Sequence, residues 1–330
     1  MAVLPRLMPG DGRTGTAPMD QRTAIADLGT NTFKLLVASL TPEGKLRTEL
    51  EEEVPVFLGK GGIERNMIAE APFQLGLEVL GRFKETALAA GATDLIGFGT
   101  SALRNARNGQ RFVDRAMELH GIPIAIIPGE DEAGLILEGV RQAVPFGAKP
   151  LLVMDIGGGS TEFILATDRA LMWKRSFELG TTRLLERFPA TDPMDLPMQL
   201  RMAAHIDACL EPLWAVMDRH WPRTLIGSEG SFGSMAAMIA RQRGNPMPAD
   251  AVECAFTTTE FDALKDLLLP MEHRQRTLVP GLPAHRVDTM LPALVLVERV
   301  LLHGVEELHW SRWSLKEGAA MRALAKTQGY

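Results

Sequence analysis

The chain has 330 residues, of which 46% are hydrophobic and 23% are charged, and its formal net charge is −6. This length corresponds to about two domains, and the apolar fraction is too high for a disordered chain. The acidic balance argues against a general nucleic-acid binder, but it leaves room for a small or linear polyanion held in a local basic cleft. The two cysteines, Cys209 and Cys254, lie far apart, which rules out a disulfide scaffold and a cysteine-based zinc site.

The sequence shows neither a membrane span nor an export signal. Its longest apolar stretches, such as 292–297, are much shorter than the about 20 residues that a spanning helix needs. Residues 1–19 lack the apolar core of a secretory signal and are rich in Pro, Gly and Thr. We therefore expect a flexible N-terminal tail and a cytoplasmic protein.

The first part of the chain predicts alternating strands and helices. Residues 23–40 contain two apolar runs around a short polar turn, which is typical of a strand–turn–strand unit. Residues 68–90 carry apolar side chains at helical spacing and stop at Gly91. The other elements expected here are strands at 44–58, 94–99 and 122–127 and a helix at 101–119. This alternation indicates an α/β domain.

The second part repeats this pattern and then becomes mainly helical. Residues 151–167 predict another strand–turn–strand unit. The other elements expected are helices at 129–143, 180–188 and 194–219, a strand at 224–227 and a helix from about Phe232. Residues 257–325 are predicted to be mostly helical, with a loop over 279–285.

Two pairs of similar segments, each pair separated by the same number of residues, indicate an internal repeat. Asp27 opens an Asp-Leu-Gly segment and Asp155 opens an Asp-Ile-Gly segment, 128 residues apart (155 − 27). The predicted strand ends at Gly99 and Gly227 have the same offset (227 − 99). We therefore expect two homologous halves that face each other across a cleft, where ligand sites are common.

The sharpest motif is the segment 155–162, Asp-Ile-Gly-Gly-Gly-Ser-Thr-Glu. Its glycines let the backbone approach a ligand closely and aim several N–H groups at phosphate oxygens. Asp155 and Glu162 flank the turn, where their carboxylates can hold Mg²⁺ directly or through water. Three glycines alone are typical of a tight hairpin, but the two carboxylates and the second copy at Asp27 favour phosphate binding. The predicted phosphate-binding residues of this loop are Gly157, Gly158, Gly159 and Ser160.

Two further loops predict contacts with an anion. The partner loop after Asp27 offers small hydroxyl and amide side chains, and Lys34 adds charge, although this loop without the repeat is typical of an Asx-type turn. The loop after the 224–227 strand opens a helix whose N-terminus favours anions, while Glu229 works against that. The residues concerned are Gly29, Thr30, Asn31 and Thr32 in the first loop and Gly227, Ser228, Gly230 and Ser231 in the second.

Glu130, Asp131 and Glu132 form an acidic cluster at the junction of the two halves. Acidic side chains at a helix N-terminus stabilise the macrodipole, which is sufficient to explain the first two. A carboxylate that faces a phosphate cleft also suits a general base for water. Arg104, just after the 94–99 strand, is the basic residue best placed for substrate oxygens.

Other common active-site patterns do not occur in the sequence. The histidines show no metal-ligand spacing, and the chain contains neither a G-x-S-x-G elbow nor a Walker A sequence. This argues against acyl transfer by that elbow and against a P-loop NTPase.

Taken together, these loops resemble the exopolyphosphatase / guanosine pentaphosphate phosphohydrolase (Ppx/GppA phosphatase) family, which belongs to the actin, Hsp70 and sugar-kinase superfamily. The resemblance runs from about Thr23 to the C-terminus. The matching segments are AIADLGTNTFKLLVA, GTSALRNA, IIPGEDEAGLILEGV, MDIGGGSTEFIL, LGTTRLLERF, GSEGSFGSMAA and WSLKEGAAMRA. The family hydrolyses the terminal phosphate of inorganic polyphosphate or of guanosine pentaphosphate with a divalent metal.

The resemblance also implies roles for individual residues. The catalytic glutamate of the family corresponds to Glu132, and the arginine of its G-T-x-x-x-R segment corresponds to Arg104. Its metal-side carboxylates correspond to Asp155 and Glu162, and Asp27 is a further candidate ligand for Mg²⁺ or Mn²⁺. The phosphate loops of the family correspond to 29–32, 157–160 and 227–231.

Three positions depart from the family pattern. Gly134 stands where Arg is usual, Glu229 replaces a small residue, and Lys316 replaces a common Arg. These changes bear on polyphosphate contacts and chain-length preference, whereas the implied catalytic core is complete. The chain resembles the short, two-domain form of the family.

We therefore expect an α/β fold of two ribonuclease-H-like domains with an interdomain cleft. The expected N-terminal domain comprises 20–128 plus a returning helix at 312–330. The C-terminal domain is expected over 129–311 and carries added helices.

The function expected from the resemblance is that of an exopolyphosphatase, a metal-dependent phosphoric anhydride hydrolase acting on inorganic polyphosphate. One alternative is a preference for guanosine pentaphosphate. Others are an ATP-binding phosphotransferase and a non-catalytic sensor of polyphosphate or guanosine tetraphosphate. We expect no nucleic-acid or membrane partner, and the resemblance implies a homodimer.

Overall fold

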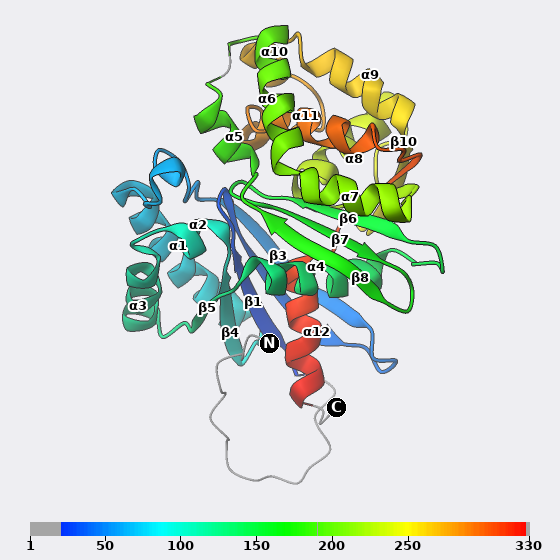
Figure 1. The fold of residues 1–330 in the computed structure, drawn as a ribbon. Helices are drawn as coiled ribbons and strands as arrows, with labels where there is room; N and C mark the ends of the chain where they lie inside the picture. Colours follow the sequence, from blue (N-terminus) through cyan, green and yellow to red (C-terminus); the bar gives the residue numbers. More distant parts are fainter. Residues whose placement is uncertain (1–20, 190, 328–330) are drawn as a thin grey trace. The chain divides into compact units, whose positions relative to one another are not determined.

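The computed structural model describes residues 21–189 and 191–327 (Figure 1). These residues form two compact units. The first comprises the chain up to Gly139 and again from Leu315, and the second spans Val140–Ser314. The first division falls inside a helix, so Glu132 belongs to the first unit, whereas the sequence boundary at 128/129 assigned it to the second. The expected tail over 1–19 and the end of the expected returning helix, 328–330, lie outside the described residues.

The first unit contains a five-stranded sheet in the order β3-β2-β1-β4-β5. β1 pairs antiparallel with β2 and parallel with β4, while β3 pairs antiparallel with β2 and β5 pairs parallel with β4. The strands are β1 (Thr23–Leu28), β2 (Thr32–Leu40), β3 (Leu46–Pro55), β4 (Asp94–Gly99) and β5 (Ile124–Ile126).

Both faces of this sheet are buried. Ala24, Ala26 and Leu28 of β1 pack into one apolar cluster, which includes side chains of α1 and α3. Because side chains alternate along a strand, the fully buried Ile25 points to the opposite face. There α12 packs against β1 and β2. The helices are α1 (Glu70–Ala89), α2 (Ser101–Asn105), α3 (Gly109–His120), α4 (Gly129–Ala143) and α12 (Leu315–Thr327), with a 3₁₀ turn η1 (Ile63–Arg65).

The single helix expected over 101–119 is two helices. Asn108 interrupts it, because its side-chain amide donates to the Ile68 carbonyl and its amide oxygen accepts from the Ile68 N–H, both at 2.9 Å. Asn side chains compete for backbone groups in this way. The break leaves Arg104 on the short helix α2, directly after β4.

The second unit contains a six-stranded sheet in the order β10-β11-β9-β6-β7-β8. Read from β8, the order β8-β7-β6-β9-β11 repeats that of the first sheet, with β10 added at the edge. The antiparallel hairpin β6/β7 corresponds to β1/β2, and β9 runs parallel to β6 as β4 does to β1. The internal repeat and the α/β fold of two ribonuclease-H-like halves are thus confirmed. The strands are β6 (Leu151–Ile156), β7 (Thr161–Ala166), β8 (Leu171–Phe177), β9 (Thr224–Ser228), β10 (Glu253–Thr257) and β11 (Glu307–Ser311).

The expectation of a mostly helical segment over 257–325 is wrong at 307–311. These residues form β11, which pairs with β9 on one side and with β10 on the other. The apolar core of the second unit includes most of α11, which has nine buried residues. The helices of the second unit are α5 (Thr181–Arg187), α6 (Leu196–Cys209), α7 (Glu211–His220), α8 (Gly230–Gln242), α9 (Thr258–Leu268), α10 (His273–Arg276) and α11 (Met290–Leu301), with η2 (Ala284–Arg286).

Within the described ranges, none of the helices combines the length and the apolar composition that a bilayer crossing requires.

Candidate functional site

Arg104 and Glu132 form a buried ion pair in the first unit. Arg104 follows the end of β4, and its N–H donates to the Thr100 carbonyl at 2.8 Å. Its Nη1 donates to the Ile127 carbonyl at 3.0 Å and to Glu132 Oε2 at 2.8 Å. The two side chains are 17% and 9% exposed, so the pair is largely shielded from water. The structure thus brings together the predicted arginine and the predicted general base.

The loop between β1 and β2 is held by the segment that follows β3. The Thr30 carbonyl accepts from the Gly59 N–H at 3.1 Å, and the Asn31 carbonyl accepts from the N–H groups of Val56 and Phe57 at 2.9 and 2.8 Å. Gly29 is required here, because a Cβ at that position would lie 2.8 Å from the Thr32 carbonyl oxygen. The loop therefore directs its carbonyls into the protein, as an anion-binding loop needs.

Asp27 and Lys34 are direct neighbours across the hairpin. They are paired in the β1/β2 register, and Lys34 is paired with Glu53 in the β2/β3 register. Lys34 therefore stands between two acidic residues on adjacent strands, and opposite charges across strands stabilise a sheet. This position gives Lys34 a structural role beside the predicted phosphate contact.

The glycine loop of the second unit, between β6 and β7, closes in the same way as the loop between β1 and β2. The Gly157 N–H closes the hairpin on the Ser160 carbonyl at 3.0 Å. The Gly158 carbonyl accepts from the N–H groups at the start of α5, Thr182 at 2.9 Å and Arg183 at 3.2 Å. Among the described residues, the N–H groups of Gly158 and Gly159 have no backbone acceptor. The loop thus presents N–H groups and withdraws carbonyls, as expected for a phosphate nest.

Two residues that the sequence analysis did not assign shape this loop. Arg183 donates from Nε to the Gly159 carbonyl at 3.1 Å and from Nη2 to Glu178 at 2.8 Å. A Cβ at Gly180 would lie 2.3 Å from the Gly158 carbonyl carbon and oxygen, so only glycine fits there. Both residues belong to the quoted segment LGTTRLLERF, which was the available signal.

Asp155 and Glu162 lie opposite each other on β6 and β7. Asp155 Oδ2 accepts from the hydroxyls of Ser228 and Ser314, both at 2.6 Å. Glu162 Oε1 accepts from the Ser176 hydroxyl at 2.6 Å, and Glu162 is 2% exposed. The hydroxyl donors orient the two carboxylates, and oxygen ligands of this kind fit a hard divalent cation.

The third loop joins β9 to α8 through an unusual backbone. Glu229 has φ 42° and ψ −147°, and Gly230 has φ 37°. The Glu229 N–H donates to the Ser311 carbonyl at 2.8 Å, which links the loop to the end of β11. Gly227 has no room for a side chain, because a Cβ would lie about 2 Å from the Phe232 ring. Ser228 and Ser231 are buried at this site.

Arg286 is a further cation that sequence reasoning missed. Its Nη1 lies 3.1 Å from the position that a Cβ on Gly230 would take, so the guanidinium sits at the start of α8. Its Nε donates to His285 Nε2 at 3.0 Å. The loop that the sequence predicted over 279–285 ended one residue before Arg286. The signal that was available was an arginine in a Gly- and Pro-containing loop before an apolar helix.

Lys316, the departure at the start of α12, is 1% exposed in the first unit. Its Nζ lies 3.0 Å from Glu51 Oε1 and 2.8 Å from Glu317 Oε1. The lysine therefore neutralises two acidic residues within its own unit.

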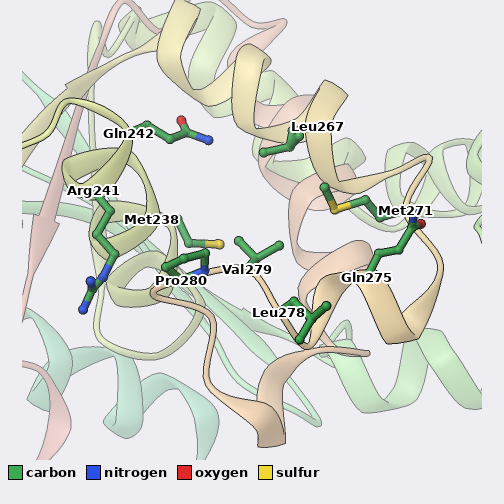
Figure 2. Close-up of a pocket in the computed structure, with 9 residues that line it drawn as sticks. All are labelled: Met238, Arg241, Gln242, Leu267, Met271, Gln275, Leu278, Val279 and Pro280. Atoms are coloured by element: carbon green, nitrogen blue, oxygen red, sulfur yellow. The ribbon is translucent and has the colours of Figure 1, made fainter.

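An apolar groove of the second unit lies away from these loops. Figure 2 shows it between α8, α9 and the segment after α10, with a volume of about 420 Å³. Its lining residues are Met238, Arg241, Gln242, Leu267, Met271, Gln275, Leu278, Val279 and Pro280. None of the predicted site residues lines this groove. The predicted site residues lie instead in polar loops at strand ends.

Comparison with known proteins adds an independent line of evidence. A model of the Ppx/GppA phosphatase family matches residues 37–327. The crystal structure of an exopolyphosphatase from Cytophaga hutchinsonii superposes with a TM-score of 0.89 at 34% identity, covering 93% of this chain and 98% of that one. A putative exopolyphosphatase of Haemophilus influenzae is 28% identical over 297 residues, 89% of each chain. A guanosine-5'-triphosphate,3'-diphosphate pyrophosphatase of Vibrio vulnificus is 26% identical over 316 residues, which are 95% of this chain and 61% of that protein.

Proposed function

The chain belongs to the Ppx/GppA phosphatase family, and on that premise we propose that it is an exopolyphosphatase that removes the terminal phosphate of inorganic polyphosphate. The observation that carries this proposal is the buried Arg104–Glu132 pair. It combines a carboxylate suited to accept a proton from water with a cation suited to phosphate oxygens. The relatives named exopolyphosphatase, which match over nearly their full length, support the same substrate class.

In the proposed reaction, Glu132 orients a water molecule and takes its proton as the water oxygen attacks the terminal phosphorus. A new P–O bond forms, and the anhydride bond to the next phosphate breaks. The products are orthophosphate and a polyphosphate that is shorter by one unit. Arg104 binds oxygens of the terminal phosphate and keeps the Glu132 carboxylate oriented through their 2.8 Å contact.

We further propose that backbone N–H groups of the second unit bind phosphoryl oxygens. The N–H groups of Gly158 and Gly159 are free of backbone acceptors among the described residues, so they suit phosphoryl oxygens. Such preorganised donors stabilise the charge that gathers on these oxygens as the anhydride bond breaks. Ser160 and the third loop, with Arg286 beside Gly230, extend this set of anion contacts.

We also propose a divalent cation, Mg²⁺ or Mn²⁺, as cofactor. Asp155 and Glu162 would hold it directly or through water. The fit rests on the donor set, because both carboxylates of the second unit are oriented by serine hydroxyls and stand opposite each other. When bound, the cation would offset negative charge on the phosphoryl oxygens.

A second candidate function is hydrolysis of guanosine pentaphosphate. The likeness to the Vibrio vulnificus protein favours it, since that relative is named for a guanosine substrate. The two substrates share the terminal phosphoanhydride and differ in the group attached beyond it, a longer phosphate chain in one and a nucleoside in the other. A non-catalytic sensor would have no need of the oriented Glu132, which argues for an enzyme.

We further propose that the protein acts in the cytoplasm as a homodimer. Cys209 and Cys254 are both free thiols, as is usual in a reducing compartment. Light scattering coupled to size-exclusion chromatography tests the dimer, and a monomeric mass at micromolar concentration would contradict it.

The function is tested by colorimetric detection of orthophosphate released from polyphosphate, with Mg²⁺ and with a chelator. We expect release that depends on the metal and on Glu132. Guanosine pentaphosphate as a competing substrate separates the two candidates, because the preferred one suppresses hydrolysis of the other. ATP serves as the control, and turnover of ATP alone would contradict both.

A further inference from the structure

The start of helix α5 pairs with three successive carbonyls of the glycine loop between β6 and β7. The Thr181 N–H donates to the Gly157 carbonyl at 3.0 Å, and the next two N–H groups of the helix donate to the Gly158 carbonyl at 2.9 and 3.2 Å. The Arg183 side chain continues the series, because its Nε donates to the Gly159 carbonyl at 3.1 Å. The carbonyls of this loop are therefore drawn to the α5 side.

This arrangement determines where the N–H groups of the loop point. Each carbonyl shares a peptide group with the N–H of the next residue, and in a planar trans peptide the two point in opposite directions. The N–H groups of Gly158, Gly159 and Ser160 therefore point away from α5. The three residues are buried, yet their N–H groups have no backbone acceptor among the described residues. Buried N–H groups are nearly always paired, so three together favour an anion at this place.

The third peptide group of the loop is held differently from the first two. Backbone N–H groups of α5 hold the first two carbonyls, whereas no backbone N–H of the described residues donates to the Gly159 carbonyl. Glycine permits wide rotation of the backbone, so the peptide group between Gly159 and Ser160 can turn over where nothing holds it. Its carbonyl would then face the anion in place of the Ser160 N–H and would repel it.

The Arg183 guanidinium is well suited to hold this carbonyl. The side chain is 14% exposed, and its Nη2 lies 2.8 Å from Glu178 Oε2. The guanidinium is therefore fixed by a carboxylate as well as by the loop. A charged donor makes a stronger hydrogen bond than a neutral one. Donation to the carbonyl also polarises the peptide group, which makes the Ser160 N–H a better donor in turn.

We infer that Arg183 is a positioning residue: its Nε holds the Gly159 carbonyl so that the Ser160 N–H joins those of Gly158 and Gly159 in binding one phosphoryl group. The inference rests on the proposed function, since it assigns a residue to the same phosphate-binding loop. It places Arg183 outside contact with the substrate and makes its effect pass through the Ser160 N–H.

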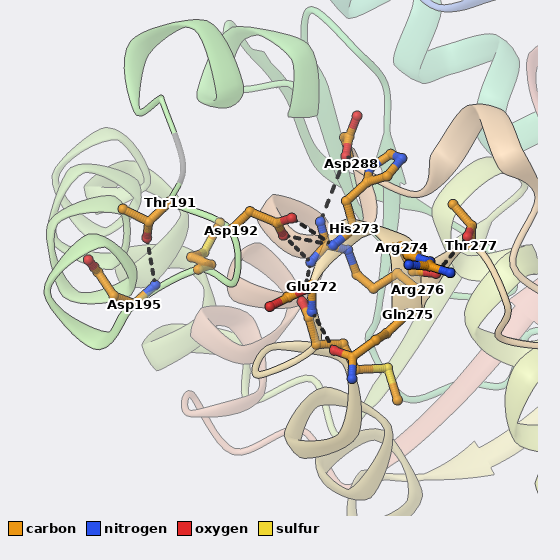
Figure 3. A network of polar contacts seen from close by, with 12 residues as sticks. Thr191, Asp192, Asp195, Glu272, His273, Arg274, Gln275, Arg276, Thr277 and Asp288 are labelled. Atoms are coloured by element: carbon orange, nitrogen blue, oxygen red, sulfur yellow. Dashed lines mark hydrogen bonds and ion pairs between the residues drawn. The ribbon is translucent and has the colours of Figure 1, made fainter.

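Another arginine of the second unit provides a structural comparison (Figure 3). The Arg276 side chain is 4% exposed, and its Nη1 lies 3.2 Å from Asp192 Oδ1. The His273 N–H donates to both carboxylate oxygens of Asp192 at 2.8 Å. The residues labelled in Figure 3 include none of the predicted site residues. We therefore expect Asp192→Asn to affect stability and to leave the glycine loop intact.

Two substitutions of Arg183 separate its hydrogen bond from its charge. Arg183→Gln keeps a nitrogen donor on Cδ, where arginine has Nε, and removes the charge. Arg183→Met keeps an unbranched stem and removes both. With tripolyphosphate as the probe, we expect Arg183→Met to lower kcat by at least about tenfold and to change KM by less than about threefold, because oriented donors act on charge that develops in the transition state. Arg183→Gln should retain kcat within about threefold of wild type.

Two control variants accompany these measurements. Arg187→Met, at an exposed arginine of the same helix, should leave kcat and KM unchanged. Asp192→Asn should lower the Tm without lowering kcat. A loss of kcat that follows the loss of stability in all variants would assign Arg183 a structural role and would overturn the inference.

The NMR resonance of the Ser160 amide gives a readout that needs no turnover. The chain has nine serines, so ¹⁵N-serine labelling gives a simple spectrum, in which the peak that is lost in Ser160→Ala identifies Ser160. Because a hydrogen bond to a carbonyl polarises the N–H of the same peptide group, its loss should shift this resonance. In the free protein we expect a shift in Arg183→Met and a position close to wild type in Arg183→Gln.

The outcomes separate this inference from the proposed function. Equal losses of kcat in Arg183→Gln and Arg183→Met overturn the inference, because they assign the guanidinium charge to the substrate. An unchanged kcat or an unmoved Ser160 resonance in Arg183→Met overturns it as well.

If the wild type releases no phosphate, the proposed function fails, and titration with tripolyphosphate in the presence of a chelator decides the inference. The Ser160 resonance should then move in the wild type and move less in Arg183→Met, and no movement in the wild type overturns the inference. If Arg183→Met does not fold, Glu178→Gln takes its place, because it loosens the guanidinium without removing it. It should lower kcat by about threefold, and an unchanged kcat contradicts the inference.

Discussion

Arg104 Nη1 and Glu132 Oε2 lie 2.8 Å apart, although the two residues stand on different helices, α2 and α4. The Ile127 carbonyl accepts from the same nitrogen at 3.0 Å, so the guanidinium is fixed by the end of β5 as well as by the carboxylate. A charged pair with so little exposure holds both groups in one orientation before substrate arrives.

Replacing Arg104 should weaken substrate binding. We expect Arg104→Ala to raise the KM for polyphosphate by about tenfold or more, because a charge-assisted contact to phosphate is lost. Steady-state phosphate release over a range of polyphosphate concentrations measures this. Arg111→Ala, an exposed arginine on α3, is the matched control. An unchanged KM with a lower kcat would instead assign Arg104 to the transition state.

The metal proposal predicts a shift in cation dependence. Asp155→Asn removes one charge from the proposed ligand set, and it should raise the Mg²⁺ concentration for half-maximal activity by at least about tenfold. Ser314→Ala leaves the carboxylate but removes one of its two hydroxyl donors, so a smaller shift in the same direction is expected. Asp168→Asn, on the exposed turn before β8, serves as control. Identical Mg²⁺ curves for Asp155→Asn and wild type would refute the assignment.

The packing of Gly180 against the glycine loop makes a steric prediction. A Cβ there would lie 2.3 Å from the Gly158 carbonyl, and backbone cannot move aside as a flexible side chain does. Gly180→Ala should cost about 1–3 kcal/mol of stability and should distort the loop enough to lower kcat. Thermal unfolding and turnover measure the two effects. Gly147→Ala, where nothing lies within 4 Å, should behave as wild type, and a harmless Gly180→Ala would contradict the geometry.

The Arg243–Glu260 pair predicts a pH-dependent stability that is separate from activity. Hydrogen bonds from Arg243, with those of Thr257, lower the pKa of Glu260 from 4.5 to about 2. Because the folded pKa lies below the unfolded one, the stabilisation is complete above pH 4.5 and is lost as the pH falls towards 2. Glu260→Gln should therefore cost about 1 kcal/mol at pH 7, given the partial exposure of the pair, and progressively less at lower pH.

Thermal unfolding of Glu260→Gln and wild type at pH 7 and near pH 2.5 measures this effect. Glu253→Gln, an exposed glutamate on β10, is the control for loss of charge. A Tm difference that stays constant over this range would contradict the pKa assigned to Glu260.

The sequence predicted the elements that are determined locally. The two hairpins and the helix over 129–143 were predicted because turn glycines and apolar spacing lie within a few residues of each other. The strand β11 was missed, because it is five residues long and its partners β9 and β10 are distant in the chain. Its pairing is a tertiary effect that local spacing does not reveal.

The same distinction applies to the candidate site. Glu132, Arg104 and the glycine loop were predicted from motifs that are contiguous in the sequence. Ser314 was missed, because it reaches Asp155 across 159 positions of the chain. Arg286 is placed beside Gly230 by the turn before α11, which no sequence spacing encodes. The residues that orient the predicted groups were therefore found only from the fold.

The most direct test of the account is the rate of orthophosphate release from polyphosphate by wild type and by Glu132→Gln, with Mg²⁺ present. Glu130→Gln, an exposed glutamate in the same turn of α4, is the control. We predict that the wild type and Glu130→Gln release phosphate at similar rates and that Glu132→Gln is slower by at least about 100-fold, since the carboxamide does not accept the proton. Near wild-type turnover by Glu132→Gln would contradict the role of Glu132 as general base.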